Sequence, residues 1–571
     1  MRIDYKKSML VAFLLTVSTS EGFSSKGIED LPATLSVQEG NDNHIMIDGY
    51  DEDILLEGSW YFDWDEGSLT SYGAPAGKYV LHFNDEESGV SKELEVSVLE
   101  DTQENQEDEE EVSIEQESVP TVEKKAVKKS VKKVQKSKKP VETSTALSSL
   151  GKNAHLIEVA HGESIEAAIK TAVAGDTILV HGGVYDERID VEYLKGTANN
   201  WITISNYPGE KPVLYASETG KVFNIEHSAY VKLNGFVIKE PKGVGIRVFH
   251  SHHVIVSNNE VYGEGKRGNP GGGAHAIVAD GRKGKESHDI LITGNYLHHN
   301  LTRFDVNGNK TDDETLTVKG AVSYATVENN RVVDNQFIGI DIIGPEYGNW
   351  GHSHHNVIRN NYVARNGGKY GDAVYVDGGK NHIVEYNTVE ENRGSGISIS
   401  QEHEGKVQRG IIVRYNKVGN QQENQVYIGD TSGTQSDIKH ILFENNYLFS
   451  TKAADNAHVG IGAGDNVQMN GNYFDLSGKD IIRKVYDAGG PSMRTNSIKA
   501  NLYANKHIQE EVETLGWGSV SAGKVVKNDA LKTEAGADMS RIPPANSSSL
   551  ILGDRALTTT KVSGSGHRIK L

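Results

Sequence analysis

Short segments of alternating apolar and polar residues recur between about residues 254 and 473 and set the pattern of the chain. Each segment leads to an asparagine, and successive asparagines lie between 26 residues apart (Asn361 to Asn387) and 36 residues apart (Asn259 to Asn295). Such period-two segments, repeated at a regular interval without a long helical run, predict coils built from strands and turns. The asparagines that close the segments are Asn259, Asn295, Asn330, Asn361, Asn387, Asn416, Asn446 and Asn472.

A second short strand is predicted between successive asparagine segments, for example at residues 276–279 and 373–376. One coil is too short to bury its own apolar side chains. Each strand is therefore expected to pair with its equivalent in the next coil and to point alternate side chains inward. Asparagine tolerates left-handed backbone angles, and its side-chain amide can bond to the same residue in the coils above and below. The pattern thus predicts a solenoid with an asparagine ladder.

The repeated strands and turns resemble the right-handed parallel β-helix of the pectate-lyase-like superfamily over residues 154–505. The resemblance implies an all-β solenoid. A short helix that begins after Ser164, followed by the turn at Gly175 and Asp176, looks like the N-terminal cap of secreted β-helix enzymes. Because many activities share this fold, the function has to be argued from the site.

Composition divides the rest of the chain into a leader, a small module, a linker and a tail. Residues 1–20 have a basic start, a short apolar run and small residues, as in a secretory signal peptide. Residues 30–100 contain short alternating strands, similar to a small immunoglobulin-like β-sandwich module. Residues 101–148 hold an acidic block and a lysine block without aromatic residues, which predicts a disordered linker. Residues 530–571 are predicted to be a poorly ordered tail.

The composition also restricts the class of protein. The absence of cysteine from the 571 residues excludes disulfides, metal thiolates and a cysteine nucleophile. A net charge of -20 argues against general nucleic-acid binding, and the apolar run near the N-terminus is too short to span a membrane. We expect a secreted protein, extracellular or periplasmic and monomeric, whose partner is an acidic polysaccharide held in a local basic cleft.

Aligning the second strands on their apolar positions predicts which side chains share a face. Ile277, Leu316, Ile340, Val374 and Ile397 form one column that should face the core. The positions beside them form two outward columns, because side chains alternate along a strand. The first outward column is Arg247, Val278, Thr317, Asp341, Tyr375, Ser398 and Tyr427, and the second is Asp280, Lys319, Ile343, Asp377 and Ser400.

The outward columns predict a patch of polar and charged side chains. Neighbouring coils lie ~4.8 Å apart, and positions two residues apart along a strand lie ~6.6 Å apart. Long insertions flank the patch, and their aromatic residues suit stacking on sugar rings. The patch is expected to hold Lys319, Asp341, Tyr375 and Asp377, with Asp312, Asp313, Glu314 and His403 entering from adjacent turns. The residues expected to bind substrate are Arg247, Asp280, Tyr347, Trp350 and Glu402.

The phrase Asp312-x-Glu314, with Lys319 five residues after the glutamate, resembles β-helix lyases of the chondroitinase B and alginate lyase group. The Lys-base pectate lyase group has a comparable phrase. The resemblance implies that acids here, Asp312, Asp313 and Glu314, bind a calcium ion. It also implies that Lys319 takes the proton α to the uronate carboxylate. The cation would neutralise that carboxylate and make the proton acidic. Tyr375 is expected to orient the sugar and the leaving group together with Asp377 and His403, and Asp341 to hold the ion or the substrate.

Departures from these families leave a second enzyme class open. The chondroitinase-like group carries an arginine where this chain has Asp341, and the pectate lyase group has paired aspartates where this chain has Phe337 and Ile338. A glycoside hydrolase would instead use Asp341 and Asp377 as paired carboxylates, with Glu402 as a third candidate acid.

A third class is a non-catalytic carbohydrate-binding protein or adhesin. Such a protein needs aromatic and amide side chains along its face but no lysine clustered with acids. His275 and the pair His298 and His299 are assigned no role, because a histidine on a turn is more often solvated than bound to a metal. The leading hypothesis is a secreted polysaccharide lyase that cleaves a uronate-containing glycan by β-elimination.

Overall fold

The computed structural model describes several separate stretches of the chain. They are the strands between residues 34 and 99, and residues 155–216, 220–263, 275–300, 314–344, 353–367, 371–401, 407–430, 437–451, 458–461, 464–477, 482–484, 496–513, 519–521, 523–526 and 531–544. The predicted signal peptide (1–20) and linker (101–148) lie outside the described residues.

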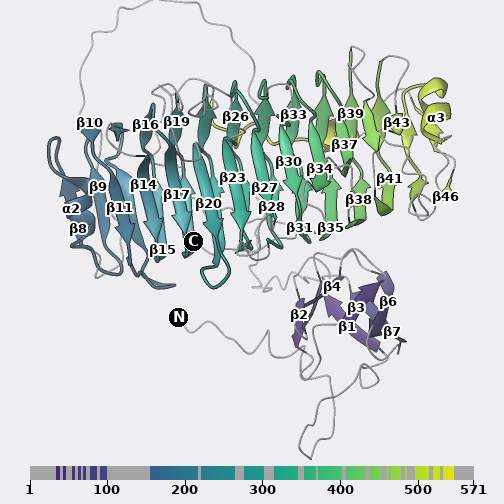
Figure 1. The fold of residues 1–571 in the computed structure, drawn as a ribbon, viewed down its shortest axis with the longest axis horizontal. Coiled ribbons are helices and arrows are strands. Elements are labelled where there is room, and N and C mark those ends of the chain that lie inside the picture. The colour runs from purple at the N-terminus through teal and green to yellow at the C-terminus, as the bar shows by residue number, and fades with distance from the viewer. Residues whose placement is uncertain are drawn as a thin grey trace, which may run out of the picture.

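Three long parallel sheets form the solenoid in the part of the chain that the structure describes (Figure 1). A coil visits the first, second and third sheet in turn, and each strand pairs in parallel with its equivalent one coil on. The first sheet contains β8 (Leu156–Val159), β9 (Thr177–Val180), β12 (Ile202–Asn206), β15 (Ala229–Asn234), β18 (His252–Ser257), β21 (Ser287–Thr293), β25 (Thr326–Glu328), β28 (Val357–Arg359), β32 (Ile383–Glu385), β35 (Val407–Arg414), β38 (Asp437–Glu444), β41 (Asp465–Asn470), β44 (Ser497–Lys499) and β46 (Ser519–Val520), with β24 (Val322–Ser323) and β31 (Gly379–Lys380) attached to β21 and β35.

The second sheet consists of short strands that the sequence pattern did not reveal as a separate sheet. It contains β10 (Gly183–Asp186), β13 (Pro212–Tyr215), β16 (Val237–Lys239), β19 (Glu260–Tyr262), β22 (Tyr296–His298), β26 (Arg331–Val333), β29 (Tyr362–Ala364), β33 (Thr388–Glu390), β36 (Lys417–Gly419), β39 (Tyr447–Phe449), β42 (Tyr473–Asp475), β45 (Leu502–Tyr503) and β47 (Lys524–Val525). Most of these strands are too short to show an alternating pattern, so each coil has one strand more than predicted.

The third sheet carries the predicted second strands. It contains β11 (Ile189–Glu192), β14 (Lys221–Glu226), β17 (Val244–Phe249), β20 (Ile277–Gly281), β23 (Leu316–Gly320), β27 (Ile340–Ile343), β30 (Val374–Asp377), β34 (Ile397–Gln401), β37 (Val426–Asp430), β40 (Val459–Ile461) and β43 (Ile482–Lys484). The prediction of an all-β solenoid is confirmed, and the strands continue to β47, beyond residue 505.

The N-terminal strands form two small sheets. One has the order β1-β7-β6-β3, with β1 and β7 parallel and the other pairs antiparallel, and the other is antiparallel with the order β2-β5-β4. Their bounds are β1 (Thr34–Gln38), β2 (Asn43–Met46), β3 (Ile54–Glu57), β4 (Phe62–Asp65), β5 (Ser68–Ser71), β6 (Gly77–Asp85) and β7 (Ser91–Leu99).

A short helix, α2 (Ile165–Ile169), covers the N-terminal end of the coils. Its N-cap is Ser164, whose hydroxyl accepts a hydrogen bond from the Ala167 amide at 3.1 Å, as the sequence predicts. Ile165 and Ile169 are buried against the core. The helix therefore shields apolar side chains that would otherwise face water at the open end of a solenoid. None of the helices in the described residues is long and apolar enough to cross a membrane.

Asparagine side chains form a ladder inside the coils. The sequence predicts that one asparagine supplies both the left-handed backbone and the bonds to the next coil, but in the structure two neighbouring residues supply them. The residue before each ladder asparagine has a left-handed backbone, for example Asn329 with φ 57° and Asn360 with φ 50°. The ladder residue itself bonds to the next coil: the Oδ1 of Asn361 accepts from the main-chain N–H of Asn330 at 2.9 Å. The ladder runs through Asn259, Asn295, Asn330, Asn361, Asn387, Asn416, Asn446, Asn472 and Asn501.

A second amide ladder, which the sequence analysis missed, lies five residues further along each coil. The Oδ1 of Asn335 accepts from the Asn300 amide at 3.1 Å, and the same pattern continues through Asn366 and Asn392 to Gln421. These side chains are buried, so each bond satisfies main-chain groups that no water can reach. The sequence signal for this second ladder is an asparagine five residues after an asparagine of the first ladder.

Residues 531–544 lie within the predicted tail, and for these residues the prediction of poor order is wrong. After α4 (Leu531–Glu534) the chain crosses the coils in reverse order, bonding to them through main-chain groups. We call residues 531–544 the strap. Its contacts are Lys532 to Asp475, Gly536 to Tyr415, Ala537 to Thr388, Asp538 to Asn360, and Pro543 to Arg331.

His382 gives the fold a predicted dependence on pH. Its side chain is fully buried, its Nδ1 accepts from the Asn356 amide at 3.1 Å, and burial lowers its pKa well below the usual 6.5. Below about pH 6.5 this histidine is protonated in the unfolded chain but stays neutral in the folded chain. The free energy of unfolding is therefore highest above that pH and falls as the pH decreases. We expect denaturant unfolding at a series of pH values to show this loss, and His382→Gln to reduce its slope by up to ~1.4 kcal/mol per pH unit. An unchanged slope in the variant would show that His382 is not its source.

Candidate active site

The outer face of the third sheet brings the predicted columns together. The core column is confirmed: Ile277 pairs with Leu316 and Leu316 with Ile340, and all three side chains are buried. Both outward columns are also confirmed in register. They run Arg247, Val278, Thr317, Asp341, Tyr375, Ser398, Tyr427 and Asp280, Lys319, Ile343, Asp377, Ser400.

Lys319, on β23, contacts a histidine that the sequence analysis set aside. Its Nζ lies 3.3 Å from Nε2 of His275, the residue two positions before the core residue Ile277. The lysine is partly exposed, whereas only 5% of the His275 side chain is exposed. The ring of His275 is thus more buried than the lysine that it contacts.

Oxygen atoms surround the other ring nitrogen of His275. Its Nδ1 lies 3.1 Å from the main-chain oxygen of Glu314, 3.3 Å from Oε2 of the same residue, and 3.0 Å from Oγ1 of Thr317. A carbonyl and a carboxylate can only accept, so these neighbours assign the ring proton to Nδ1. Nε2 is then an acceptor directed at Lys319 Nζ, and Glu314, His275 and Lys319 form a chain of hydrogen-bonding groups.

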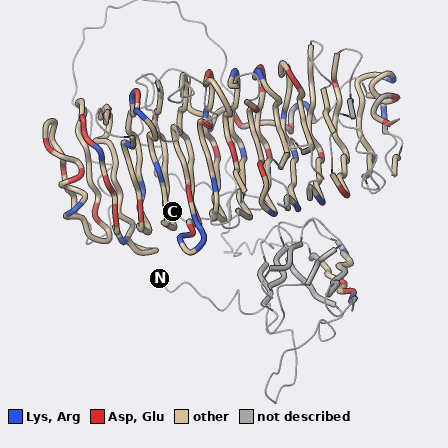
Figure 2. Tube along the Cα trace, in the orientation of Figure 1, with Lys and Arg blue, Asp and Glu red and all other residues tan. Residues whose placement is uncertain are grey.

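The second cluster on this face is ionic. Arg247 on β17 donates from Nη2 to Oδ2 of Asp280 on β20 at 3.0 Å, and its Nη1 lies 3.6 Å from Oε2 of Glu226. Arg282 bonds to the other carboxylate oxygen of Asp280. The guanidinium of Arg247 also lies over the ring of Phe249, 4.1 Å from its centroid. Figure 2 shows the basic residues that gather at the turn after β20.

Asp341, Tyr375 and Asp377 are on the predicted face but are nearly inaccessible. Their exposed fractions are 2%, 6% and 5%. Asp341 pairs in register with Tyr375 on the next coil, so Asp341 and Asp377 are diagonal neighbours. Lys319 is therefore the more accessible group on this face.

Several predicted site residues lie outside the described residues: Asp312, Asp313, Tyr347, Trp350, Glu402 and His403. Glu314 is the described member of the proposed calcium ligands. Its carboxylate offers the oxygen donors that calcium prefers, but Oε2 lies against His275 and Thr317. The fit to calcium therefore rests on one carboxylate in the described chain.

His275 and Thr317 are the functional candidates that sequence reasoning missed. The register contained a signal for His275. It precedes the core residue Ile277 by two positions, and Glu314 precedes the paired core residue Leu316 by two positions, so the two are equivalent in adjacent coils. Two residues at equivalent positions of adjacent coils lie side by side in a solenoid. Thr317 was placed in the right column, but its contact with the histidine depends on a ring in the preceding turn.

A comparison with protein families agrees with this architecture. The family model of the right handed beta helix region matches residues 221–407 and 285–474. A protein of Bacillus subtilis (strain 168), the uncharacterized protein YwoF, is 28% identical over 316 residues, which are 49% of this chain and 63% of that protein. The chain thus spans less than two thirds of the length of this relative.

Solved structures to which this chain is similar include two lyases. The PL6 family alginate lyase AlyGC has a TM-score of 0.44 and 14% identity, covering 68% of this chain and 58% of that chain. Pectate lyase Pel9A has a TM-score of 0.40 and 15% identity, covering 55% of this chain and 79% of that chain. At these identities the likeness concerns the fold alone.

Proposed function

We propose that this right-handed parallel β-helix protein is a polysaccharide lyase that cleaves a uronate-containing glycan by β-elimination. The observation that carries the proposal is the contact of Lys319 Nζ with His275 Nε2 at 3.3 Å, on the outer face of the third sheet. A base for this reaction must be reachable by a sugar and must be able to lose its own proton. Lys319 is partly exposed, and its Nζ lies beside a ring nitrogen that can accept a hydrogen bond from it.

Glu314 and His275 prepare the base. The Nδ1 proton of His275 faces Glu314, so Nε2 presents a lone pair to Lys319 Nζ and orients the amine. The amine then removes the proton on C5 of the uronate, next to the carboxylate. The electron pair of that C–H bond forms the C4–C5 double bond, and the C4–O4 glycosidic bond breaks. The leaving oxygen takes a proton from water, so the products are a new non-reducing end with an unsaturated uronate and a new reducing end on the other fragment.

Arg247 binds a uronate carboxylate in the proposed complex. Its guanidinium is held in place by Glu226, Asp280 and the ring of Phe249, so little side-chain entropy is lost when the substrate binds. Arginine matches a carboxylate with two parallel hydrogen bonds. Arg247 stands two coils from Lys319, ~10 Å along the solenoid, which places this carboxylate on a sugar next to the one that reacts.

A calcium ion at Asp312, Asp313 and Glu314 is part of the proposal. When bound, it would supply positive charge that stabilises the developing negative charge on the carboxylate. We also propose export directed by residues 1–20, for which mass spectrometry of the mature N-terminus in the medium or periplasm is the check.

The test is to incubate the purified protein with pectate, alginate, chondroitin and ulvan, with and without a chelator. Elimination produces an unsaturated uronate, and its ultraviolet absorbance should rise on one of these glycans. A rise that the chelator abolishes supports the cation, and a rise that it leaves intact removes the cation from the proposal. New reducing ends without absorbance would instead indicate a hydrolase that uses Asp341, Asp377 and Glu402, and neither signal would leave a binding protein.

A further inference from the structure

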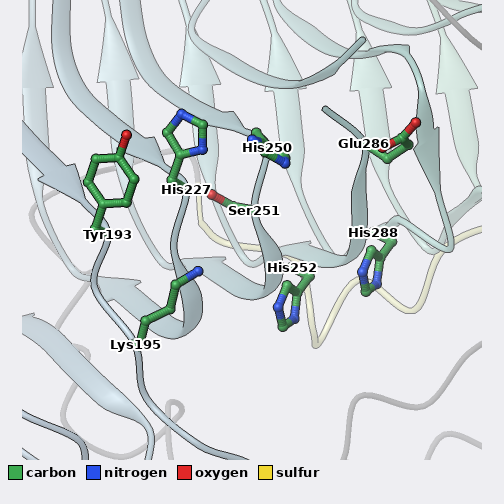
Figure 3. A pocket seen from close by; sticks show the side chains of 8 residues that line it. All are labelled: Tyr193, Lys195, His227, His250, Ser251, His252, Glu286 and His288. Carbon is green, nitrogen blue, oxygen red and sulfur yellow. The ribbon is translucent and has the colours of Figure 1, made fainter. Parts of the chain in front are cut away.

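A histidine-rich groove lies on the N-terminal coils, at the corner between the third and the first sheet. Its volume is about 430 Å³, and Figure 3 shows the side chains that line it. His252 and His288 stand side by side at one part of this groove, on β18 and β21. None of these residues belongs to the proposed active site. The lining residues are Tyr193, Lys195, His227, His250, Ser251, His252, Glu286 and His288.

At this corner, one residue with a left-handed backbone on each of the coils of β18 and β21 leaves two consecutive side chains pointing outward. His253 has φ 52° and Asp289 has φ 53°, and they are in register because His252 pairs with His288 and Val254 with Ile290. In a regular strand, one of two consecutive side chains would point to the core. Here all four side chains, those of His252, His253, His288 and Asp289, are at least partly exposed.

The donor atoms of these side chains lie close together. One ligand atom from each of His253, His288 and Asp289 is within 4.8 Å of the other two. Nδ1 of His288 lies 2.7 Å from Oδ2 of Asp289, and Nδ1 of His253 lies 3.9 Å from the same oxygen. Among the residues that the structure describes, this is the one group of three such donors.

We propose that His253, His288 and Asp289 bind a divalent transition-metal ion of the zinc class. Two imidazoles and one carboxylate suit zinc and its neighbours, whereas calcium and magnesium prefer oxygen donors alone. Zinc bonds to nitrogen and oxygen are ~2.0–2.2 Å long, which places tetrahedral donors ~3.4 Å apart. The pair of His288 and Asp289 at 2.7 Å therefore has to open, and the pair of His253 and Asp289 at 3.9 Å has to close. The side chains of His253, Asp289 and His288 are 31%, 25% and 43% exposed, which leaves them room to adjust.

His252 supports the site from outside. Its ring stacks on that of His288 with a centroid distance of 4.9 Å and an angle of 3°, which holds the His288 ring in place. Its Nδ1 lies 3.0 Å from Nδ1 of His253, and this contact has to open when that nitrogen binds the ion. Neighbours that fix ring orientation raise the affinity of a metal site. Three protein donors leave further positions on the ion for water or a ligand, which the adjoining groove can admit. This proposal is independent of the lyase activity.

The test is a calorimetric titration of the full chain with Zn²⁺, compared with Ca²⁺ and Mg²⁺. We expect one saturable Zn²⁺ site per chain that is lost, or weakened at least ~10-fold, in His288→Ala, Asp289→Asn and His253→Asn. Asparagine tolerates the left-handed backbone at positions 253 and 289, so these two variants should fold normally. The spectrum of Co²⁺ bound in place of zinc should change in the same three variants.

The chain offers a matched control for the other histidines. His355 has φ 54° in the same column, and its Nδ1 lies 2.7 Å from that of His354, but the equivalent of Asp289 on the next coil is Asn381. His355→Asn should therefore leave Zn²⁺ binding unchanged. Zn²⁺ binding that is equal in all four variants and the unaltered protein, or no saturable binding at all, would overturn the proposal. Tighter binding of Ca²⁺ than of Zn²⁺ would also overturn it.

Discussion

Lys319→Ala is expected to lower kcat/KM on the cleaved glycan by about 100- to 10,000-fold, the range for loss of a general base. Alanine removes the amine that takes the C5 proton and that contacts His275 Nε2. Lys319→Arg is the sharper variant, because it keeps the positive charge but cannot give up its proton. Arginine at this position should lower kcat strongly and leave KM nearly unchanged, as measured from the initial rate of ultraviolet absorbance.

An exposed lysine far from the site supplies the control. Lys499 lies on β44, near the C-terminal end of the coils, and its replacement by alanine should leave the rate and the unfolding midpoint unchanged. Full activity in Lys319→Ala would exclude the lysine as base. A kcat retained in Lys319→Arg, with activity lost only in Lys319→Ala, would assign the residue an electrostatic role instead.

Asn361→Ala is expected to lower the free energy of unfolding by about 3 kcal/mol, because it removes two buried hydrogen bonds to main-chain groups of the preceding coil. The Asn361 amide donates to the main-chain oxygen of Val327 at 2.9 Å, and its Oδ1 accepts from the Asn330 N–H at 2.9 Å. Both bonds connect adjacent coils where water is excluded. Chemical denaturation with a spectroscopic readout measures the difference.

Asn199→Ala is the matched control, since Asn199 is exposed on a turn and outside the ladder. We expect a change of less than about 0.5 kcal/mol there. If Asn361→Ala costs no more than Asn199→Ala, the coils are held by strand pairing and apolar packing, and the ladder contributes little.

The register of the third sheet was predictable from the sequence because two constraints agree. Alternation fixes which residues of a strand face the core, and stacking fixes which residues of neighbouring coils are adjacent. Ile277, Leu316 and Ile340 therefore aligned correctly, and with them Asp280 beside Lys319. The first asparagine ladder followed from the same periodicity.

The rest depended on features that alternation does not encode. His275 precedes β20, so its ring direction is set by the turn and by the oxygens of Glu314 and Thr317. The ion pair of Arg247 and Asp280 depends on how far these side chains reach between adjacent coils. Three-residue strands such as β22 are too short to show alternation and are defined by their hydrogen bonds to neighbouring strands. The left-handed backbone at His253, which breaks the alternation, was equally invisible to a period-two reading.

The strap changes how the solenoid can come apart. In a simple repeat array each coil is coupled only to its nearest neighbours, so the ends fray one coil at a time. The strap links the coil of Asp475 to that of Arg331 through contacts on the coils between them. If one coil in this interval unfolds, the strap also loses its contacts with the other coils. The coils of this interval are therefore expected to unfold together as one cooperative unit. The N-terminal coils, with His253 and the groove, lie outside that unit and join it through strand pairing, as between β21 and β25.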